Sequence, residues 1–478
     1  MSPTTPIEHS TPPLTVEDLA QCALEMVRNE QWSELTSLLS KDPFIAKVPV
    51  ESQGRLLLHY AGMYCAPHHI MEALIDANPD GPATRAKMGC LPLFPVLRRG
   101  PAANLSTVRL ILKSRGVKGT LIMRNDLGMC PLHLGAMHGV KESVMEEVLR
   151  LEPRAALLER TRDGATPLMM YWYRVLNCKK GKASFENLIR SLRCEDNSVT
   201  ISDEYRDYFI ESWKTMSVLL RSGYKSQMLY LKKVPAAKYL PLHAIASLRC
   251  PSSMLALAFY MNSLDKERRV NENFCPTEVD EFGNNALFIA MEYMWTERQI
   301  LPDAGPCDDE NVDENSVSSV DEDDDNSTYA NGDEQVSKHR SAELKDRPIE
   351  MFADNSGISI FHTLLKKYPN LSHLRHQKGI HPIHAAISRG ISWNDGLKTI
   401  LAASPDAAYA QNASRLYPFM YSASKIWTLL DDAYLLLKTR PNLVSTGINV
   451  SRKRRFENSC AEMDAIDLKK TPCLLSDF

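Results

Sequence analysis

The chain of 478 residues lacks the short motifs that mark most enzymes. A Gly-Lys pair occurs at Gly181-Lys182, but without the glycine-rich frame of a phosphate-binding loop. The Gly-x-Ser-x-Gly turn of serine hydrolases is absent from the sequence, as are the catalytic-loop and Asp-Phe-Gly motifs of protein kinases. We therefore expect a protein that is not an enzyme and that needs no cofactor.

The sequence also lacks the features of membrane and secreted proteins. No hydrophobic run approaches the roughly 18–20 residues that a membrane helix needs. Residues 1–13 lack a basic start followed by an apolar core, so we expect no secretory signal. The eleven cysteines form no Cys-x-x-Cys pair, which is typical of a reducing compartment. These absences predict a cytoplasmic or nuclear protein without a membrane contact.

The sequence does contain a repeat of 36–37 residues. Pairs of aliphatic residues are followed about four residues later by proline, which disfavours the helical conformation in the residue before it. Each pair therefore predicts the apolar face of a short helix that stops before the proline. The pairs and their prolines are Leu38-Leu39 with Pro43, Leu74-Ile75 with Pro79, Val148-Leu149 with Pro153, Leu364-Leu365 with Pro369, Ile400-Leu401 with Pro405 and Leu436-Leu437 with Pro441.

A second pattern follows each of these prolines after about 13 residues. It consists of proline, an aliphatic residue and often histidine, and in several copies glycine stands three residues before the proline. Glycine permits a tight turn, and proline suits the first position of a helix. The clearest copies begin at Pro92, Pro131, Pro167, Pro241, Pro382 and Pro418, with glycines at Gly89, Gly128, Gly164 and Gly379.

One copy, Gly128 to Gly139, resembles the Gly-x-Thr-Pro-Leu-His-x-Ala-Ala signature of ankyrin repeats. Another, Asp163 to Leu168, keeps the Thr-Pro of that signature. The resemblance implies an all-α solenoid of stacked helix–turn–helix units whose role is to bind proteins. The period departs from the family's usual 33 residues, and most of the threonines are missing. Tetratricopeptide and HEAT repeats also contain paired aliphatic residues, but they lack the Gly-x-x-Pro-Leu-His start.

Two stretches interrupt the repeats. One is polar and begins near Lys179-Lys180. The other, 303–346, holds fifteen acidic residues against three basic ones, a net charge of −12, and we expect it to be a disordered loop. The expected organisation is a flexible start (1–14), repeats (15–176), a polar insertion (177–209), irregular repeats (210–301), the acidic loop (302–347), repeats (348–444) and a flexible tail (445–478).

The acidic loop suggests two roles. Because the whole chain carries −3, the residues outside the loop carry +9. The loop is then either a solvated spacer or a segment that folds back on a basic face and competes with an acidic partner. Ser318 and Ser319 each precede an acidic residue by three positions, which resembles an acidophilic kinase site and makes them possible phosphorylation sites.

Arginines recur in the turns that precede the helix pairs. They predict a binding surface for an acidic patch on a protein partner, although solvated loop positions would show the same pattern. The alternative function is a nuclear regulator that contacts nucleic acid or chromatin through the basic face and the tail. The turn arginines are Arg85, Arg124, Arg160, Arg162 and Arg375, and the tail carries a possible nuclear import signal at Arg452, Lys453, Arg454 and Arg455.

The histidines suggest a metal site at first sight, because His373/His376 and His381/His384 form His-x-x-His pairs. His384, however, occupies the position of the repeat that is also histidine in three other copies, His59, His133 and His243. No cysteine pair or carboxylate joins them at zinc-ligand spacing. We expect no metal and a structural role, in which each imidazole bonds the backbone of the neighbouring turn.

Overall fold

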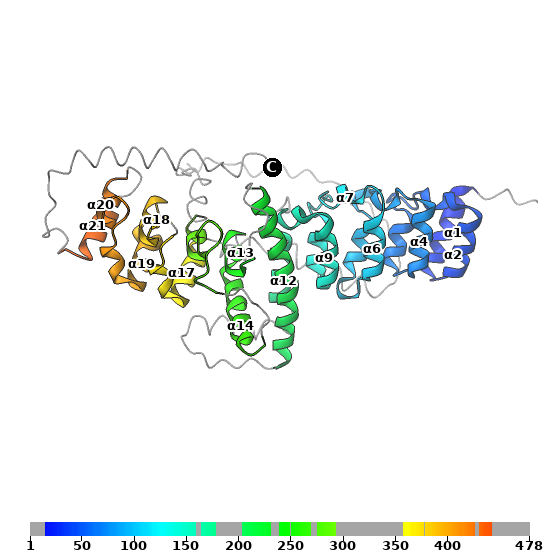
Figure 1. Cartoon of the computed structure of the whole chain (residues 1–478). Coiled ribbons are helices and arrows are strands. Elements are labelled where there is room, and N and C mark those ends of the chain that lie inside the picture. The colour runs from blue at the N-terminus through cyan, green and yellow to red at the C-terminus, as the bar shows by residue number, and fades with distance from the viewer. Residues whose placement is uncertain are drawn as a thin grey trace, which may run out of the picture. The chain divides into compact units, whose positions relative to one another are not determined.

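The computed structural model confirms an all-α protein (Figure 1). It describes residues 15–158, 164–177, 203–230, 239–248, 250–268, 275–292, 357–376, 378–425 and 430–441. Within these ranges the backbone forms helices and turns, together with an isolated antiparallel bridge between Val50 and Arg55. The chain divides into two units, Met1–Phe274 and Cys275–Phe478, and each is described separately.

Helix pairs build the first unit. Its first helices contact one another in chain order, and so do its second helices, which produces two packed rows. Figure 1 shows these pairs side by side from α1 to α12. The first helices are α1 (Val16–Arg28), α3 (Leu57–Met63), α5 (Leu93–Arg98), α8 (Pro131–His138) and α10 (Pro167–Asn177). The second helices are α2 (Trp32–Lys41), α4 (His68–Ala77), α6 (Leu105–Lys113), α9 (Glu142–Leu151) and α12 (Asp203–Tyr230), and α7 (Val117–Thr120), α13 (Pro241–Ser247) and α14 (Ser252–Arg268) complete the unit.

The second helices end before the repeat prolines, as expected. The sequence did not predict that four of these prolines, Pro43, Pro153, Pro369 and Pro405, start a 3-10 turn. In the first of these, the Asp42 carboxylate accepts a hydrogen bond from the Phe44 backbone N–H at 3.1 Å. Proline suits this place because it gives up a donor that the start of a helical turn leaves unpaired. The 3-10 turns of the first unit are η1 (Pro43–Lys47), η2 (Gly81–Ala83), η3 (Lys87–Gly89), η4 (Gly100–Ala102) and η5 (Pro153–Leu157).

The core of the first unit lies around its first helices. Residues 57–62 of α3 and 131–136 of α8 are all buried, because each helix packs against the pair before it, the pair after it and the second row. Small residues permit this close approach. A Cβ atom added at Gly62 would lie 2.9 Å from the Val96 Cγ2 atom of α5. These helices are therefore buried around most of their circumference.

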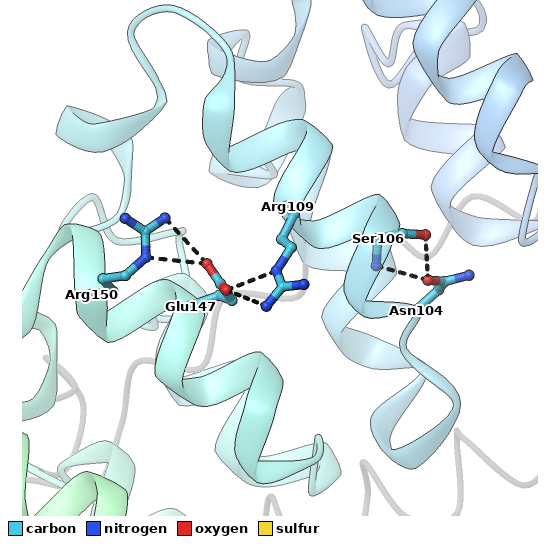
Figure 2. Close-up of polar contacts among 5 residues, drawn as sticks. All are labelled: Asn104, Ser106, Arg109, Glu147 and Arg150. Carbon is cyan, nitrogen blue, oxygen red and sulfur yellow. Dashed lines mark hydrogen bonds and ion pairs between the residues drawn. The ribbon is translucent and has the colours of Figure 1, made fainter.

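An ion-pair cluster joins two neighbouring second helices (Figure 2). The Arg109 Nε on α6 donates to the Glu147 Oε1 on α9 at 2.7 Å, and the Arg150 guanidinium donates to the Glu147 Oε2 at 3.2 Å. Hydrogen bonding from Arg109 lowers the pKa of the Glu147 carboxyl. The start of α6 is capped separately, since the Asn104 Oδ1 accepts from the Ser106 backbone N–H at 2.9 Å. The cluster therefore joins two successive helix pairs within the row of second helices.

Helix α12 begins earlier than the expected end of the polar insertion. The sequence predicts residues 203–209 as part of that insertion, but they form the first two turns of this 28-residue helix. The reason is a helical apolar stripe that continues through Phe209, Trp213 and Met216, all buried. The Tyr208 hydroxyl also donates to the Val175 carbonyl of α10 at 3.2 Å. The rest of the insertion, 178–202, lies outside the described residues.

The second unit repeats the same design. Helix α18 packs on α20, and α17 packs on α19. The helix at 286–292 belongs to this unit, whereas the sequence predicts it as part of the preceding repeats. The centroid of its Phe288 ring lies 5.6 Å from that of the His376 ring. The elements are α17 (Gly357–Lys367), the 3-10 turn η7 (Pro369–His373), α18 (Pro382–Ser388), the π-helical turn η8 (Trp393–Leu397), α19 (Lys398–Ala403), the 3-10 turn η9 (Pro405–Tyr409), α20 (Pro418–Ala423) and α21 (Leu430–Lys438).

The close approach of α5 and α8 generates the first prediction. Gly100 follows α5 with φ +60°, and a Cβ atom there would collide with the backbone carbonyl oxygen of His138. We expect Gly100→Ala to lower the free energy of unfolding by at least about 2 kcal/mol, because both the backbone strain and the collision disfavour the native state. The measurement is urea unfolding followed by circular dichroism.

The control for this prediction is Gly119→Ala. Gly119 lies in α7, and no atom lies within 4 Å of an added Cβ. We expect this variant to match the wild type or to gain about 0.5–1 kcal/mol, since alanine favours a helix. Equal stability of the two variants would contradict the proposed packing of α5 against α8.

Candidate protein-binding surface

The turns that precede the first helices share one geometry. In each of five turns the first residue donates its backbone N–H to the carbonyl of the residue four positions later, at 2.8–3.1 Å. The fourth residue has φ between +59° and +78°, which is why glycine recurs there. The five turns are 86–90, 125–129, 280–284, 376–380 and 412–416, and their positive-φ residues are Gly89, Gly128, Gly283, Gly379 and Arg415.

Side chains reinforce these turns. The Asn125 Oδ1 accepts from the backbone N–H groups of Leu127 at 3.1 Å and Met129 at 2.9 Å. The Asp280 Oδ1 accepts in the same way from Phe282 and Asn284. Such side-chain bonds two and four residues ahead hold a turn in place without help from the rest of the fold. The turns at 125–129 and 280–284 are therefore held by their own side chains.

Backbone hydrogen bonds join successive turns of the first unit. The Lys87 N–H donates to the Gln53 carbonyl at 2.9 Å, and the Asp126 N–H donates to the Met88 carbonyl at 3.1 Å. The Arg85 guanidinium adds a third link, because it donates to the Arg124 carbonyl at 2.9 Å. The turns at 86–90 and 125–129 thus form one continuous edge rather than two independent loops.

This edge exposes apolar side chains beside its arginines. Met88 is 53% exposed, Met123 42% and Leu127 47%, while Arg85 and Arg124 are also exposed. We call these five residues the turn edge. Apolar residues with this exposure stand out against a unit whose other methionines and leucines are mostly buried.

The structure gives the predicted turn arginines different places. Arg85 and Arg124 come together on the turn edge, but Arg85 also braces the next turn through its bond to a carbonyl. Arg375 is exposed in the second unit, where it lines a groove. Sequence reasoning missed Met88 and Leu127. Their position directly before the turn glycine is a signal that could have identified them, since that position is the tip of the turn.

Several other predicted residues lie outside the described residues. They are Arg160 and Arg162, the serines Ser318 and Ser319 of the acidic segment, and the tail residues Arg452, Lys453, Arg454 and Arg455. The expected roles of these residues remain predictions.

Three of the four repeated histidines have the expected backbone partners. The Nε2 atom of His59 lies 3.3 Å from the Cys90 carbonyl, that of His133 lies 3.0 Å from the Ala165 carbonyl, and that of His384 lies 3.1 Å from the Leu416 carbonyl. At His59 the other ring nitrogen, Nδ1, accepts from the Leu56 N–H at 3.1 Å. A neutral imidazole protonated at Nε2 satisfies both contacts. Each of these histidines therefore joins one helix pair to the next.

Neither a metal site nor a reactive thiol emerges from these histidines. Among the described residues no three His, Cys, Asp or Glu side chains gather as metal ligands. The Cys130 Sγ lies 2.9 Å from the His133 Nδ1, a pairing that cysteine hydrolases also use. Both residues are completely buried, however, and burial raises the pKa of the Cys130 thiol to about 11. This pair is consequently part of the core.

Neither a family model nor a curated protein matches this chain. In the part of the chain that the structure describes, no helix has both the length and the apolar character to cross a membrane. Because no matching family or curated protein indicates a binding site for this chain, the turn edge is identified from its backbone geometry and the exposure of its side chains.

The buried histidines predict a pH-dependent stability. Burial lowers the pKa of His59 to about 4, below its usual value of 6.5. The unfolded chain therefore binds a proton that the folded chain excludes, and stability falls as the pH drops from 6.5 towards 4. We expect a loss of about 1.4 kcal/mol per pH unit from His59. In His59→Gln, which does not titrate, the loss between pH 7 and pH 5 should be smaller by about 2 kcal/mol.

The measurement is urea unfolding of wild type and variant at both pH values. Exposed His68 offers the control, because His68→Gln makes the same substitution at the surface of α4 and should leave the free energy of unfolding at pH 7 close to that of the wild type. Identical pH dependence in wild type and His59→Gln would show that the imidazole of His59 is not held neutral.

Proposed function

We propose that this protein is an ankyrin-like repeat protein that binds another protein through the turn edge, without catalysis. The observation that carries the proposal is the turn edge itself, in which hydrogen-bonded turns present arginines and exposed apolar side chains side by side. Three of the histidines that begin helix pairs support the repeat assignment, because each reaches a carbonyl 31 or 32 residues further along the chain.

The longer repeat period is compatible with this assignment. The 3-10 turns after the second helices, such as η1 and η5, occupy five residues each. They stand between the second helix and the next turn, where added residues leave the helix pair and the turn unchanged. The period of 36–37 residues then reflects an extra turn of backbone rather than a different repeat.

Binding through the turns is favoured over binding through the first helices. Residues 57–62 of α3 and 131–136 of α8 are buried, so these helices offer few side chains to a partner. The turn edge offers methionine, leucine and arginine, and methionine and arginine are enriched at protein interfaces. Its rigidity also reduces the entropy lost on binding. We therefore propose a partner with an apolar patch flanked by acidic residues.

The test is a pair of variants of the full chain. The partner is first identified by cross-linking and mass spectrometry, and its dissociation constant is then measured. We expect Met88→Glu/Leu127→Glu to weaken binding at least about tenfold, since burying a carboxylate in an apolar contact is costly. Arg124→Glu should weaken binding most at low salt, because salt screens exposed charges.

Matched controls lie outside the turn edge. Phe44→Glu changes an apolar residue that is 58% exposed in η1, and Arg115→Glu changes an exposed arginine after α6. Both should bind as the wild type does. Equal weakening by Phe44→Glu would remove the specific role of the turn edge. Retention of the chain on DNA with a steep salt dependence would instead favour the alternative of a nucleic-acid regulator.

A further inference from the structure

The second unit contains a groove of about 390 Å³ between two successive helix pairs. Its polar and aromatic lining comes from corresponding places in the two pairs, namely the 3-10 turns η7 and η9 with the residues just after them and the residues that precede α18 and α20. The side chains that matter here are His373, Arg375 and His381 from the first pair and Asp406, Tyr409 and Tyr417 from the second. None of them belongs to the turn edge of the first unit.

The position before the Pro-Leu-His start varies along the chain. It holds Leu56, Leu91 and Cys130, which are buried, and Thr166, which is half-buried. At the groove it holds His381 and Tyr417, which are half-buried and line the groove. Because buried apolar residues are sufficient for stacking at this position, stacking does not explain a histidine and a tyrosine there. A local departure from the repeat pattern of this kind is typical of a functional site.

On one wall of the groove, the negative charge of Asp406 is balanced by a neighbouring arginine. The Arg440 guanidinium lies 4.0 Å from the Asp406 carboxylate, and it stacks over the Tyr409 ring with 5.0 Å to the centroid. It also donates to the Pro405 carbonyl at 3.4 Å. Arg440 therefore balances the one carboxylate that lines the groove and holds the tyrosine in place. The positive charge of Arg375 on the facing wall is left without a counter-charge in the groove lining.

Two histidines flank Arg375. The Nδ1 atom of His373 lies 3.1 Å from the hydroxyl of buried Ser404, which leaves its Nε2 atom for a ligand. The Nε2 atom of His381 is buried and has no hydrogen-bond partner among the described residues. Burial lowers the pKa of His381, and the neighbouring positive charges of Arg375 and His373 lower it further. A buried ring nitrogen without a partner costs free energy, which a hydrogen-bond partner in the groove would restore.

We propose that this groove binds a phosphomonoester, carried on a phosphorylated side chain of a protein partner. Arg375, His373 and His381 supply three groups of donors, which match the three oxygens of the phosphate. A carboxylate has two oxygens and one charge, whereas a phosphomonoester has three oxygens and a charge of about −1.5 to −2. The arginine pairs with two oxygens in a fork, and Tyr417 borders the groove from the next pair.

Binding should be accompanied by proton uptake. The charged and titratable groups that face the histidines are Arg375 on the same pair and Asp406 with its partner Arg440 on the next. While His381 is neutral these three groups carry one net positive charge, and protonation of His381 raises the total to two. A bound phosphate dianion favours the protonated form of His381. Affinity should therefore rise as the pH falls from 7.5 to 6.5.

The experiment uses the full chain and inorganic phosphate, then a short peptide with one phosphoserine. Histidine ring signals in carbon–proton NMR spectra report binding. We expect phosphate to shift the His373 and His381 signals and to raise the pH at which His381 titrates. Arg375→Gln should weaken the affinity for the phosphopeptide at least about tenfold. His373→Gln, a change at an exposed position, should weaken it as well and serves as the second variant.

The controls separate the sources of the anion. The same peptide with glutamate or unmodified serine should bind at least about tenfold more weakly than the phosphopeptide. Lys398→Gln removes an exposed positive charge on α19 outside the groove lining and should leave binding unchanged.

The proposal would be overturned by unshifted His373 and His381 signals, by equal binding of the glutamate peptide, or by unchanged affinity in Arg375→Gln. Stronger binding of a single-stranded oligonucleotide than of the phosphopeptide would also overturn it. Because no turn-edge residue takes part, these outcomes leave the proposed function untouched.

Discussion

Three helix pairs are joined to the next by an imidazole that reaches a backbone carbonyl of the following turn. At His59 one ring nitrogen accepts from the start of its own helix, while the other donates to the Cys90 carbonyl of the next turn. His133 and His384 make the same contact with the next turn at 3.0 and 3.1 Å. Protonation would put a second donor against an N–H group inside the core. One side chain thus fixes the helix start and the register between pairs, and it can do both only while it is uncharged.

This register determines what the turns can present. Since His59 holds the Cys90 carbonyl, which closes the turn at 86–90, that turn is fixed relative to the pair before it. Glycine at positive φ then completes the turn, and the bonds from Lys87 to Gln53 and from Asp126 to Met88 follow. The residue before each glycine points away from the core. Met88 and Leu127 are exposed for that reason, and so exposed apolar side chains can be kept at little cost to folding.

Local rules in the sequence predicted local structure well. Proline marked the ends of the second helices, glycine marked the turns, and histidine marked its own backbone partner. The 3-10 turns escaped prediction because Pro-Phe-Ile-Ala and Pro-Arg-Ala-Ala read equally well as loops. The early start of α12 escaped it because polar residues at 203–207 conceal a stripe that only becomes apparent with Phe209 and Trp213. Exposure at Met88 and the groove beside Arg375 depend on which neighbours pack against each turn, and a single sequence does not encode that directly.

Two kinds of surface arise from one repeat because stacking uses only some of its positions. Stacking needs the imidazole, the turn glycine and the aliphatic pairs, and these use only part of each 36-residue period. The position before the Pro-Leu-His start is buried at Leu56, Leu91 and Cys130. At His381 and Tyr417 it is still the N-cap position of its helix, but its side chain lines a polar groove. A change at one position can therefore create a ligand site between two pairs and leave their stacking intact, because the contacts that carry the stacking lie elsewhere in the repeat.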